Sequence, residues 1–238
     1  MDPQRRTLGI LGGMGPQATL DLMRRVIART PAQREADHVH MLVDLNPHVP
    51  ARVPALDGTG PSPGPELARM TRSLVEAGAE VLVMPCNTAH AWADEITAAT
   101  NVPFLHMIDL AVDAALAGPS APQATGILAT RGTRRARLYH DRFEARGVAV
   151  LDADEEAQAR LDAVIAGVKI GADEEELRAE LRSLVDGLAR RGAPRVLLGC
   201  TELAMVAPNA GPVPLLDPAE VLAGAIVRAC TGVPRTGA

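Results

Sequence analysis

The sequence predicts an α/β fold of two similar pseudo-symmetric lobes, each a parallel sheet flanked by helices. One reason is that short, almost purely apolar runs alternate with longer helical segments along the 238 residues, as they do where helices cover both faces of a parallel sheet. A second is that 47% of the residues are hydrophobic but only 2% aromatic. A sizeable core must therefore be built from Ala, Val, Leu and Ile. The third reason is an internal repeat.

Three pairs of segments resemble each other in the same order along the chain. "LGILGGMG" is followed by "TGILATRG" 117 residues later, "GAEVLVMPCNT" by "GAPRVLLGCTE" after 114 and "NVPFLHMID" by "PVPLLDPAE" after 111. An offset this constant indicates two similar lobes. We expect a first lobe of residues 1–113 plus 217–238, and a second lobe of residues 114–216.

Eight segments have the short, β-rich and mostly apolar pattern of buried strands. They are Leu8–Gly12, His40–Asp44, Val81–Met84, Phe104–Ile108, Thr125–Ala129, Val148–Leu151, Val196–Gly199 and Val213–Leu216. Each lobe is expected to hold strands at matching places.

Helices are expected between the strands, at residues 16–30, 64–78, 172–192 and 216–232. Pro16 stands at a first-turn position, where a missing N–H costs nothing. Asp173 is an expected N-cap, and Gly192 an expected C′ residue that ends the same helix.

Two cysteines stand at the same point of the repeated segments, each directly after a strand. They are Cys86 and Cys200, and the chain holds only three cysteines. In open parallel sheets, ligands bind outside the carboxyl ends of the strands. If the lobes face each other, both cysteines would border one cleft, so we expect the active site there. Cys230 lies on the apolar side of the last helix and is interpreted as a core residue.

Two thiols on opposite sides of a bound molecule form a natural acid–base pair. The N–H groups of a following helix favour the thiolate, so we expect such stabilisation at each cysteine. A thiolate could remove a proton from one face of a carbon while a thiol returns one to the other face. Racemisation needs this two-sided arrangement.

Other uses of the cysteines explain less of the sequence. Cys86 and His90 are four residues apart, but no CxxC motif or histidine cluster completes a metal site. A hydrolase with one nucleophile needs one cysteine and a histidine base, which leaves Cys200 unexplained. A purely structural role remains an alternative, since buried cysteines are usually small hydrophobes.

Charge and hydropathy exclude further classes of function. A net charge of −5 gives no electrostatic footprint for nucleic acid. No stretch approaches 18 apolar residues, so no membrane span is expected. The N-terminus lacks the apolar region of a signal peptide. We therefore expect a cytoplasmic protein whose thiols are reduced.

The blocks "GILGGMGPQAT", "MPCNTAH" and "LLGCTEL", in this order and spacing, resemble the cofactor-independent aspartate/glutamate racemase family. The similarity covers nearly the whole chain. It implies two α/β lobes with the active site between them, no pyridoxal phosphate or other cofactor, and a homodimer. By motif match, Cys86 and Cys200 would be the two catalytic bases.

Small polar residues beside the cysteines are candidates for substrate binding. Asn87, Thr88 and Thr201 can offer hydrogen-bond donors to an α-carboxylate, and Thr130 follows a strand end that faces the same cleft. The resemblance implies that these positions line the substrate pocket and that Met14 lies against the bound ligand.

Two cations are candidates for holding carboxylates. Arg52 lies in a loop stiffened by three prolines, and the loop resembles one that binds a substrate carboxylate in aspartate racemases. Lys169 is the only lysine among 24 basic residues, which indicates a site that needs a compact ammonium. The resemblance implies a carboxylate contact for it. Lys169 could instead hold pyridoxal phosphate, but no phosphate-binding glycine loop accompanies it.

Glu202 follows "GCT", where aspartate racemases tend to have glutamate and glutamate racemases histidine. We therefore expect a pyridoxal-phosphate-independent amino-acid racemase that acts on aspartate, with glutamate as a second substrate. The alternatives are a related isomerase or decarboxylase of dicarboxylic acids, and a non-catalytic amino-acid-binding protein. Which cysteine serves which enantiomer stays open.

Overall fold

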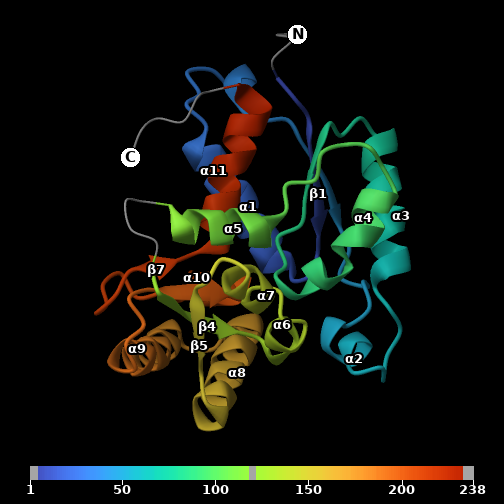
Figure 1. The fold of residues 1–238 in the computed structure, drawn as a ribbon. Coiled ribbons are helices and arrows are strands. Elements are labelled where there is room, and N and C mark those ends of the chain that lie inside the picture. Colours follow the sequence, from blue (N-terminus) through green and yellow to red (C-terminus); the bar gives the residue numbers. More distant parts are fainter. Residues whose placement is uncertain (1–4, 118–121, 233–238) are drawn as a thin grey trace. The chain divides into compact units, whose positions relative to one another are not determined.

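The computed structural model describes residues 5–117 and 122–232. The chain forms two compact units, one of Met1–Leu110 with Ala219–Ala238 and one of Ala111–Pro218. Each unit has its own parallel sheet with helices packed around it (Figure 1). The predicted α/β class with parallel sheets is confirmed.

The sheet of the first unit has the strand order β2 (Met41–Leu45), β1 (Leu8–Gly12), β3 (Val81–Val83). All its pairs are parallel, and Leu8 lies opposite both Met41 and Val81. The carboxyl ends of the three strands therefore lie at one edge of the sheet.

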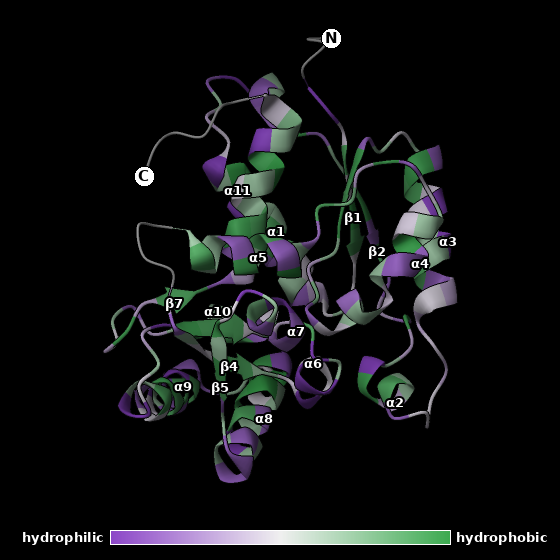
Figure 2. Cartoon of the chain, in the orientation of Figure 1, coloured by the Kyte–Doolittle hydropathy of each residue, from purple (hydrophilic) through white to green (hydrophobic). Residues whose placement is uncertain are grey.

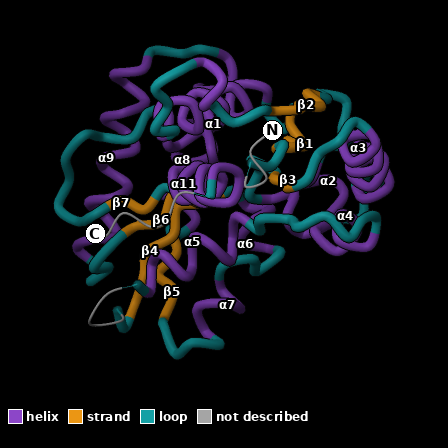
Figure 3. The backbone as a smooth tube through the Cα atoms, turned by 90° about the horizontal axis from the view of Figure 1, so that it is seen from above, coloured by secondary structure: helices purple, strands orange, loops and turns teal. Residues whose placement is uncertain are grey.

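Helices cover both faces of this sheet, as the apolar strands predict (Figures 1 and 3). Leu8 and Ile10 pack with α1 (Pro16–Arg29) and α11 (Pro218–Thr231). Leu11 points to the other face, where it packs with α3 (Gly64–Glu76) and α4 (Ala93–Ala98). The strands and the inward sides of these helices form the apolar interior in Figure 2.

The second unit contains a four-stranded sheet. Its order is β5 (Ala149–Asp152), β4 (Ala124–Ala129), β6 (Val196–Gly199), β7 (Leu215–Leu216), and all pairs are parallel. One face packs on α8 (Glu155–Ile170) and α9 (Glu174–Arg190), whose leucines and valines form one core with β6.

Shorter helices connect these elements. They are α2 (Arg52–Leu56), α5 (Met107–Leu116), α6 (Arg131–Arg135), α7 (His140–Glu144) and α10 (Thr201–Met205), with 3₁₀ turns η1 (Glu35–Asp37) and η2 (Thr88–Trp92). Within residues 5–117 and 122–232, no helix is long and apolar enough to cross a membrane. The same residues contain no cluster of three or more His, Cys, Asp and Glu side chains that could hold a metal ion.

The predicted helix boundaries are confirmed by specific contacts. Pro16 is the first residue of α1. The Asp173 carboxylate accepts a hydrogen bond of 3.0 Å from the Glu176 N–H at the start of α9. Gly192 follows that helix with φ of 93°, the left-handed conformation that ends helices.

The predicted strand Phe104–Ile108 is wrong beyond its first residue. Only Phe104 bridges to β3, through Leu82. The His106 imidazole then accepts a hydrogen bond of 3.3 Å from the Asp109 N–H, as an N-cap side chain does, and α5 begins at Met107. The last predicted strand is also shorter than expected, because only Leu215–Leu216 pair with β6.

Two glycines at the end of β1 allow the backbone to come close to Thr19 and Asn46. A Cβ on Gly12 would lie 2.6 Å from the Thr19 side chain, and one on Gly13 would lie 2.4 Å from the backbone of Asn46. Gly13 also has φ of 93°, and its N–H donates to the Thr19 hydroxyl at 3.0 Å. The "GGMG" motif is therefore a requirement of the backbone, because only glycine fits this close approach.

Gly13→Ala should lower the free energy of unfolding by about 2 to 4 kcal/mol, because it adds backbone strain and a steric clash. Trp92 is the only tryptophan of the chain and lies in the same unit, so urea denaturation followed by its fluorescence measures the effect.

Gly224→Ala is the matched control in α11 of the same unit. Its Cβ would meet only the flexible ends of Arg228 and Arg29, so stability should change by less than about 1 kcal/mol. Equal losses in the two variants would contradict the assignment.

Candidate functional site

The candidate residues of the first unit follow the carboxyl ends of its three strands. Met14 comes two residues after β1, Arg52 follows β2 at the start of α2, and Cys86 comes three residues after β3. Because these strands are parallel neighbours, the residues lie at one edge of the sheet. Met14 and Cys86 belong to the same buried cluster.

The backbone of Cys86 is held by a buried histidine. His90 Nδ1 lies 2.7 Å from the Cys86 carbonyl oxygen, and His90 Nε2 accepts a hydrogen bond of 3.2 Å from the Met107 N–H. Because Nε2 accepts, Nδ1 carries the proton and donates to Cys86. His90 thus ties Cys86 to the start of α5.

Asn87 and Thr88 follow the cysteine and are buried, with 3% and 8% of their surface exposed. Thr88 begins the 3₁₀ turn η2. The Asn87 carbonyl accepts the His90 N–H at 3.1 Å. Both residues therefore belong to the turn that directly follows Cys86.

Arg52 is held by backbone oxygens. Its guanidinium donates to the carbonyls of Val49 and Pro50 at 3.3 and 3.2 Å, and to the Met14 carbonyl at 3.4 Å. No carboxylate in residues 5–117 or 122–232 pairs with it. The structure thus brings Arg52 and Met14 together and leaves the guanidinium charge without an anionic partner among these residues.

The second unit places three candidate residues in one buried turn. Cys200 is the N-cap of α10, and Thr201 and Glu202 begin that helix. The Cys200 thiol donates to Glu202 Oε2 at 3.0 Å, and the Thr201 hydroxyl donates to the same oxygen at 3.1 Å. Glu202 is only 6% exposed.

This environment raises the pKa of the Cys200 thiol well above its ordinary value. Burial is the largest cause, followed by the Coulomb repulsion and the hydrogen bond of Glu202. The expected effect of the helix N-terminus is present, because the Glu202 backbone N–H lowers the pKa of Cys200, but burial and the Glu202 carboxylate outweigh it. The five-residue helix α10 supplies less stabilisation than burial and a neighbouring carboxylate remove. Cys200 rests as a thiol.

Lys169 lies in the last turn of α8, which ends at the left-handed Gly171. Its side chain is exposed, and its charge lowers the pKa of Cys200, although less than burial and Glu202 raise it. The structure therefore places Lys169 within electrostatic range of Cys200.

Thr130 lies beside this turn. It follows β4 directly, Cys200 follows β6, and the last residues of these strands, Ala129 and Gly199, are paired. The Thr130 hydroxyl accepts from the Thr133 N–H at 3.1 Å and donates to the Thr133 hydroxyl at 3.0 Å. Thr130 is thus the N-cap of α6.

The sequence did not identify two residues that support this half of the site. Gln158 is fully buried, and its amide donates to the Ala129 carbonyl at 3.1 Å, directly before Thr130. Tyr139 is almost fully buried and interacts electrostatically with Cys200. Burial raises the pKa of Tyr139 well above its ordinary value. Neither residue belongs to a motif. Gln158 stands between two alanines, and nothing in the sequence singles it out.

The candidate residues thus form two sets, one in each unit. The first combines a buried cysteine with a guanidinium, and the second combines a buried thiol with a carboxylate and an ammonium. Each set can move one proton and hold one anionic group. These are the parts that two-sided acid–base chemistry on a dicarboxylic acid requires.

Comparison with known proteins gives matches along most of the chain. A family model described as Asp/Glu/Hydantoin racemase matches residues 11–226. The broad-specificity amino-acid racemase RacX of Bacillus subtilis is 25% identical over 235 residues, which cover 92% of this chain and 96% of RacX. A glutamate racemase of Deinococcus radiodurans is 32% identical over 146 residues, covering 59% of this chain and 48% of that protein.

Solved structures also resemble this chain over most of its length. The aspartate racemase of Picrophilus torridus superposes with a TM-score of 0.84 at 26% identity, covering 94% of each chain. An aspartate racemase homologue from Pyrococcus horikoshii superposes with a TM-score of 0.73 at 21% identity over 95% of this chain and 99% of that one, and it supports the fold alone.

Glu202→Gln should lower the pKa of Cys200, because it removes a negative charge that opposes the thiolate and keeps an oxygen that can accept a hydrogen bond from the thiol. The rate of Cys200 alkylation by iodoacetamide, followed by mass spectrometry of its peptide, should rise at neutral pH. The pH profile of the alkylation rate should move as a whole to lower pH.

The alkylation rate on the plateau at high pH reports how accessible the thiol is, whereas the midpoint of the profile reports its pKa. The two values together therefore separate a change in ionisation from a change in exposure. A variant that raises only this plateau, with an unchanged midpoint, would show that Glu202 acts on packing and not on the charge of Cys200.

Proposed function

The chain belongs to the Asp/Glu/Hydantoin racemase family and is an isomerase, and we propose that it interconverts the enantiomers of aspartate without a cofactor. The observation that carries the proposal is the pair of buried cysteines, each at the carboxyl edge of a parallel sheet in a different unit. A two-base racemisation uses two such groups on one substrate, on opposite sides of its Cα.

In the proposed reaction, the Cys86 thiolate takes the α-proton and becomes a thiol. Its electron pair stays on Cα as a carbanion, which the α-carboxylate delocalises. The Cys200 thiol then donates its proton to the opposite face of Cα and becomes a thiolate. The product is the mirror image of the substrate, and the reverse reaction uses the other protonation state.

The hydrogen bond from Cys200 to Glu202 supports this division of roles. A thiol whose pKa is raised by burial and a carboxylate is suited to hold a proton until a carbanion needs it. Glu202 then acts as a positioning residue that keeps Cys200 protonated at rest. Cys200 is the acid of the resting enzyme and Cys86 the base.

The two cations divide the carboxylates between them. Lys169 acts within electrostatic range of Cys200, so we assign it to the α-carboxylate, where negative charge grows during the reaction. Arg52 is oriented by backbone carbonyls and binds the side-chain carboxylate through its planar, fork-like guanidinium. A hydantoin has no carboxylate and would leave both cations unused.

Aspartate is favoured over a broad range of substrates by the presence of both cations. The 26% identity with the Picrophilus torridus aspartate racemase supports the same substrate, and Glu202 stands where the sequence motif favours a four-carbon substrate. Glutamate stays a second candidate. The homodimer and the cytoplasmic location also stay predictions.

Incubation with L-aspartate in deuterated water, without any cofactor, should give D-aspartate with deuterium at Cα. Cys86→Ser and Cys200→Ser should each lower the racemisation rate by roughly 10²- to 10⁴-fold, because a serine hydroxyl is a far weaker acid than a thiol and is hardly ever ionised to a base at neutral pH. Chiral chromatography and mass spectrometry measure both results.

Cys230→Ala is the matched control. Cys230 lies in the core of the first unit and contacts none of the candidate site residues in the described clusters, so its loss should leave racemisation unchanged. If no amino acid exchanges its α-proton, the proposal fails in favour of a binding protein. Decarboxylation or cis–trans isomerisation of a dicarboxylic acid would identify the related enzyme class instead.

Arg52→Gln should raise KM for aspartate at least about tenfold, because a charged hydrogen bond is lost. Its effect on alanine, which has no second carboxylate, should be small. Lys169→Gln should impair both substrates, since both have an α-carboxylate. Steady-state kinetics on the two amino acids separates the roles.

An equal loss on both substrates in Arg52→Gln would mean that this side chain only supports the loop through the Val49, Pro50 and Met14 carbonyls. Arg52→Lys keeps the positive charge but loses the paired N–H donors of the guanidinium. It should therefore recover part of the affinity for aspartate that Arg52→Gln loses.

A further inference from the structure

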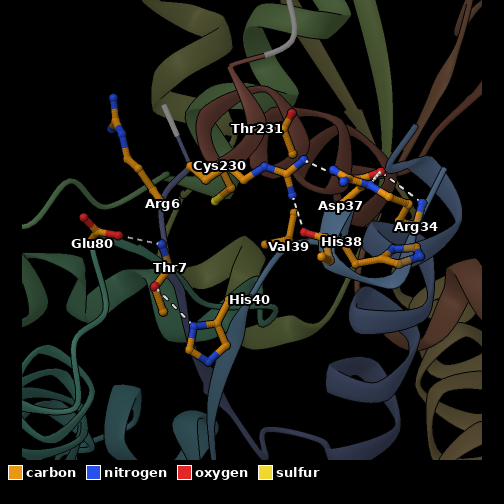
Figure 4. Close-up of a pocket in the computed structure, with 12 residues that line it drawn as sticks. Arg6, Thr7, Arg34, Asp37, His38, Val39, His40, Glu80, Cys230 and Thr231 are labelled. Atoms are coloured by element: carbon orange, nitrogen blue, oxygen red, sulfur yellow. Dashed lines mark hydrogen bonds and ion pairs between the residues drawn. The ribbon is translucent and has the colours of Figure 1, made fainter. Parts of the chain in front are cut away.

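A hollow lies at the opposite end of the first sheet from Met14 and Cys86. It has a volume of about 430 Å³ and is lined by the residues that directly precede the three strands, Thr7, His40 and Glu80. The segment around η1 and the end of α11 complete it. Figure 4 shows Cys230, Thr231, Val39 and His40 around this space.

The acidic groups of the lining are occupied by donors. Asp37 accepts from the guanidinium groups of Arg5 and Arg34 and from the N–H groups of Gln33 and Arg34. These contacts hold the pKa of Asp37 well below its usual range, with the Arg34 hydrogen bond as the largest cause. The Glu80 carboxylate accepts the Thr7 N–H at 2.8 Å.

The cationic groups are in excess. Arg5 and Arg34 share the single carboxylate of Asp37. The contacts of Arg5 with Ala36 and Asp37 use two of its five N–H donors. Arg6 also lines the hollow, and no carboxylate in residues 5–117 or 122–232 forms an ion pair with it. Three arginines and two acidic residues thus line the hollow.

Two imidazoles and two small apolar side chains also line the hollow. His40 contacts the Thr7 hydroxyl through Nδ1 at 3.3 Å, and His38 lines the same space. Val39 and Ala36 supply apolar surface. The Cys230 thiol is buried in the core, and its carbonyl accepts the Arg6 N–H at 3.0 Å. A small molecule with one anionic end and a short apolar part matches this lining.

We propose that this hollow binds a small anion, a phosphate or carboxylate group, between Arg5, Arg34 and the imidazoles of His38 and His40. Guanidinium groups bind both kinds of anion through paired hydrogen bonds. The site shares no residue with the one proposed for racemisation, so the two proposals stand independently.

Inorganic phosphate and acetate are suitable probes for the full-length protein. Imidazole ¹H–¹⁵N signals report locally, because the chain has only six histidines. Phosphate should move the signals of His38 and His40 in a saturable way and leave those of His90 and His140 in place. A stronger response to acetate than to phosphate would assign the site to carboxylates.

The double variant Arg5→Gln and Arg34→Gln should weaken phosphate binding at least about tenfold. Arg178→Gln is the control, because Arg178 also forms an exposed pair with a carboxylate of its own segment, Glu174, but lies in the other unit. The control should bind phosphate with unchanged affinity. If the double variant is unstable, the single variant Arg34→Gln, at a side chain that is 78% exposed, should still weaken binding.

Absence of saturable shifts at His38 and His40, or equal affinity in all the arginine variants, would overturn the proposal and leave an adventitious ion only.

Discussion

The parallel pairing of neighbouring strands decides where the candidate side chains of this protein lie. In each unit, strands that are far apart in the sequence end at the same edge of the sheet, and the residues after them have to share the space there. Gly13 and Gly199 permit this, because a Cβ at either position would collide with the neighbouring strand or the residue after it. Without that close approach, Met14 would not follow β1 into the same cluster as Cys86.

A second constraint is electrostatic. Cys86 and Cys200 occupy equivalent places in the repeat, yet their surroundings differ. His90 ties the Cys86 backbone to the start of α5, whereas the Glu202 carboxylate accepts a hydrogen bond from the Cys200 thiol. A duplicated framework thus gives one cysteine a backbone anchor and the other an acidic neighbour. Such asymmetry suits a pair in which one group must be protonated when the other is not.

The sequence predicted much of the framework because local signals determined it. Pro16, Asp173 and Gly192 act within one turn of their own position, and the apolar strands need only burial on both faces. The strand at Phe104–Ile108 failed because an imidazole cap at His106, which depends on side-chain orientation, starts a helix there. The state of Cys200 depends on burial and on where the Glu202 carboxylate points, and the role of Gln158 depends on a contact 29 residues away. A pattern of residues shows neither the burial nor the side-chain directions and distant contacts on which these features depend.

The imidazole of His90 has a consequence for the chemistry that the cysteine beside it can perform. A histidine one turn from a cysteine invites comparison with thiol hydrolases, in which the ring abstracts the proton of the nucleophile. Here the Nδ1 proton is committed to a carbonyl, and the lone pair of Nε2 is committed to the Met107 amide. The ring has no electron pair left with which to accept a proton. His90 therefore does not act as a base for the Cys86 thiol in this arrangement, and its ring holds the backbone around Cys86 in place.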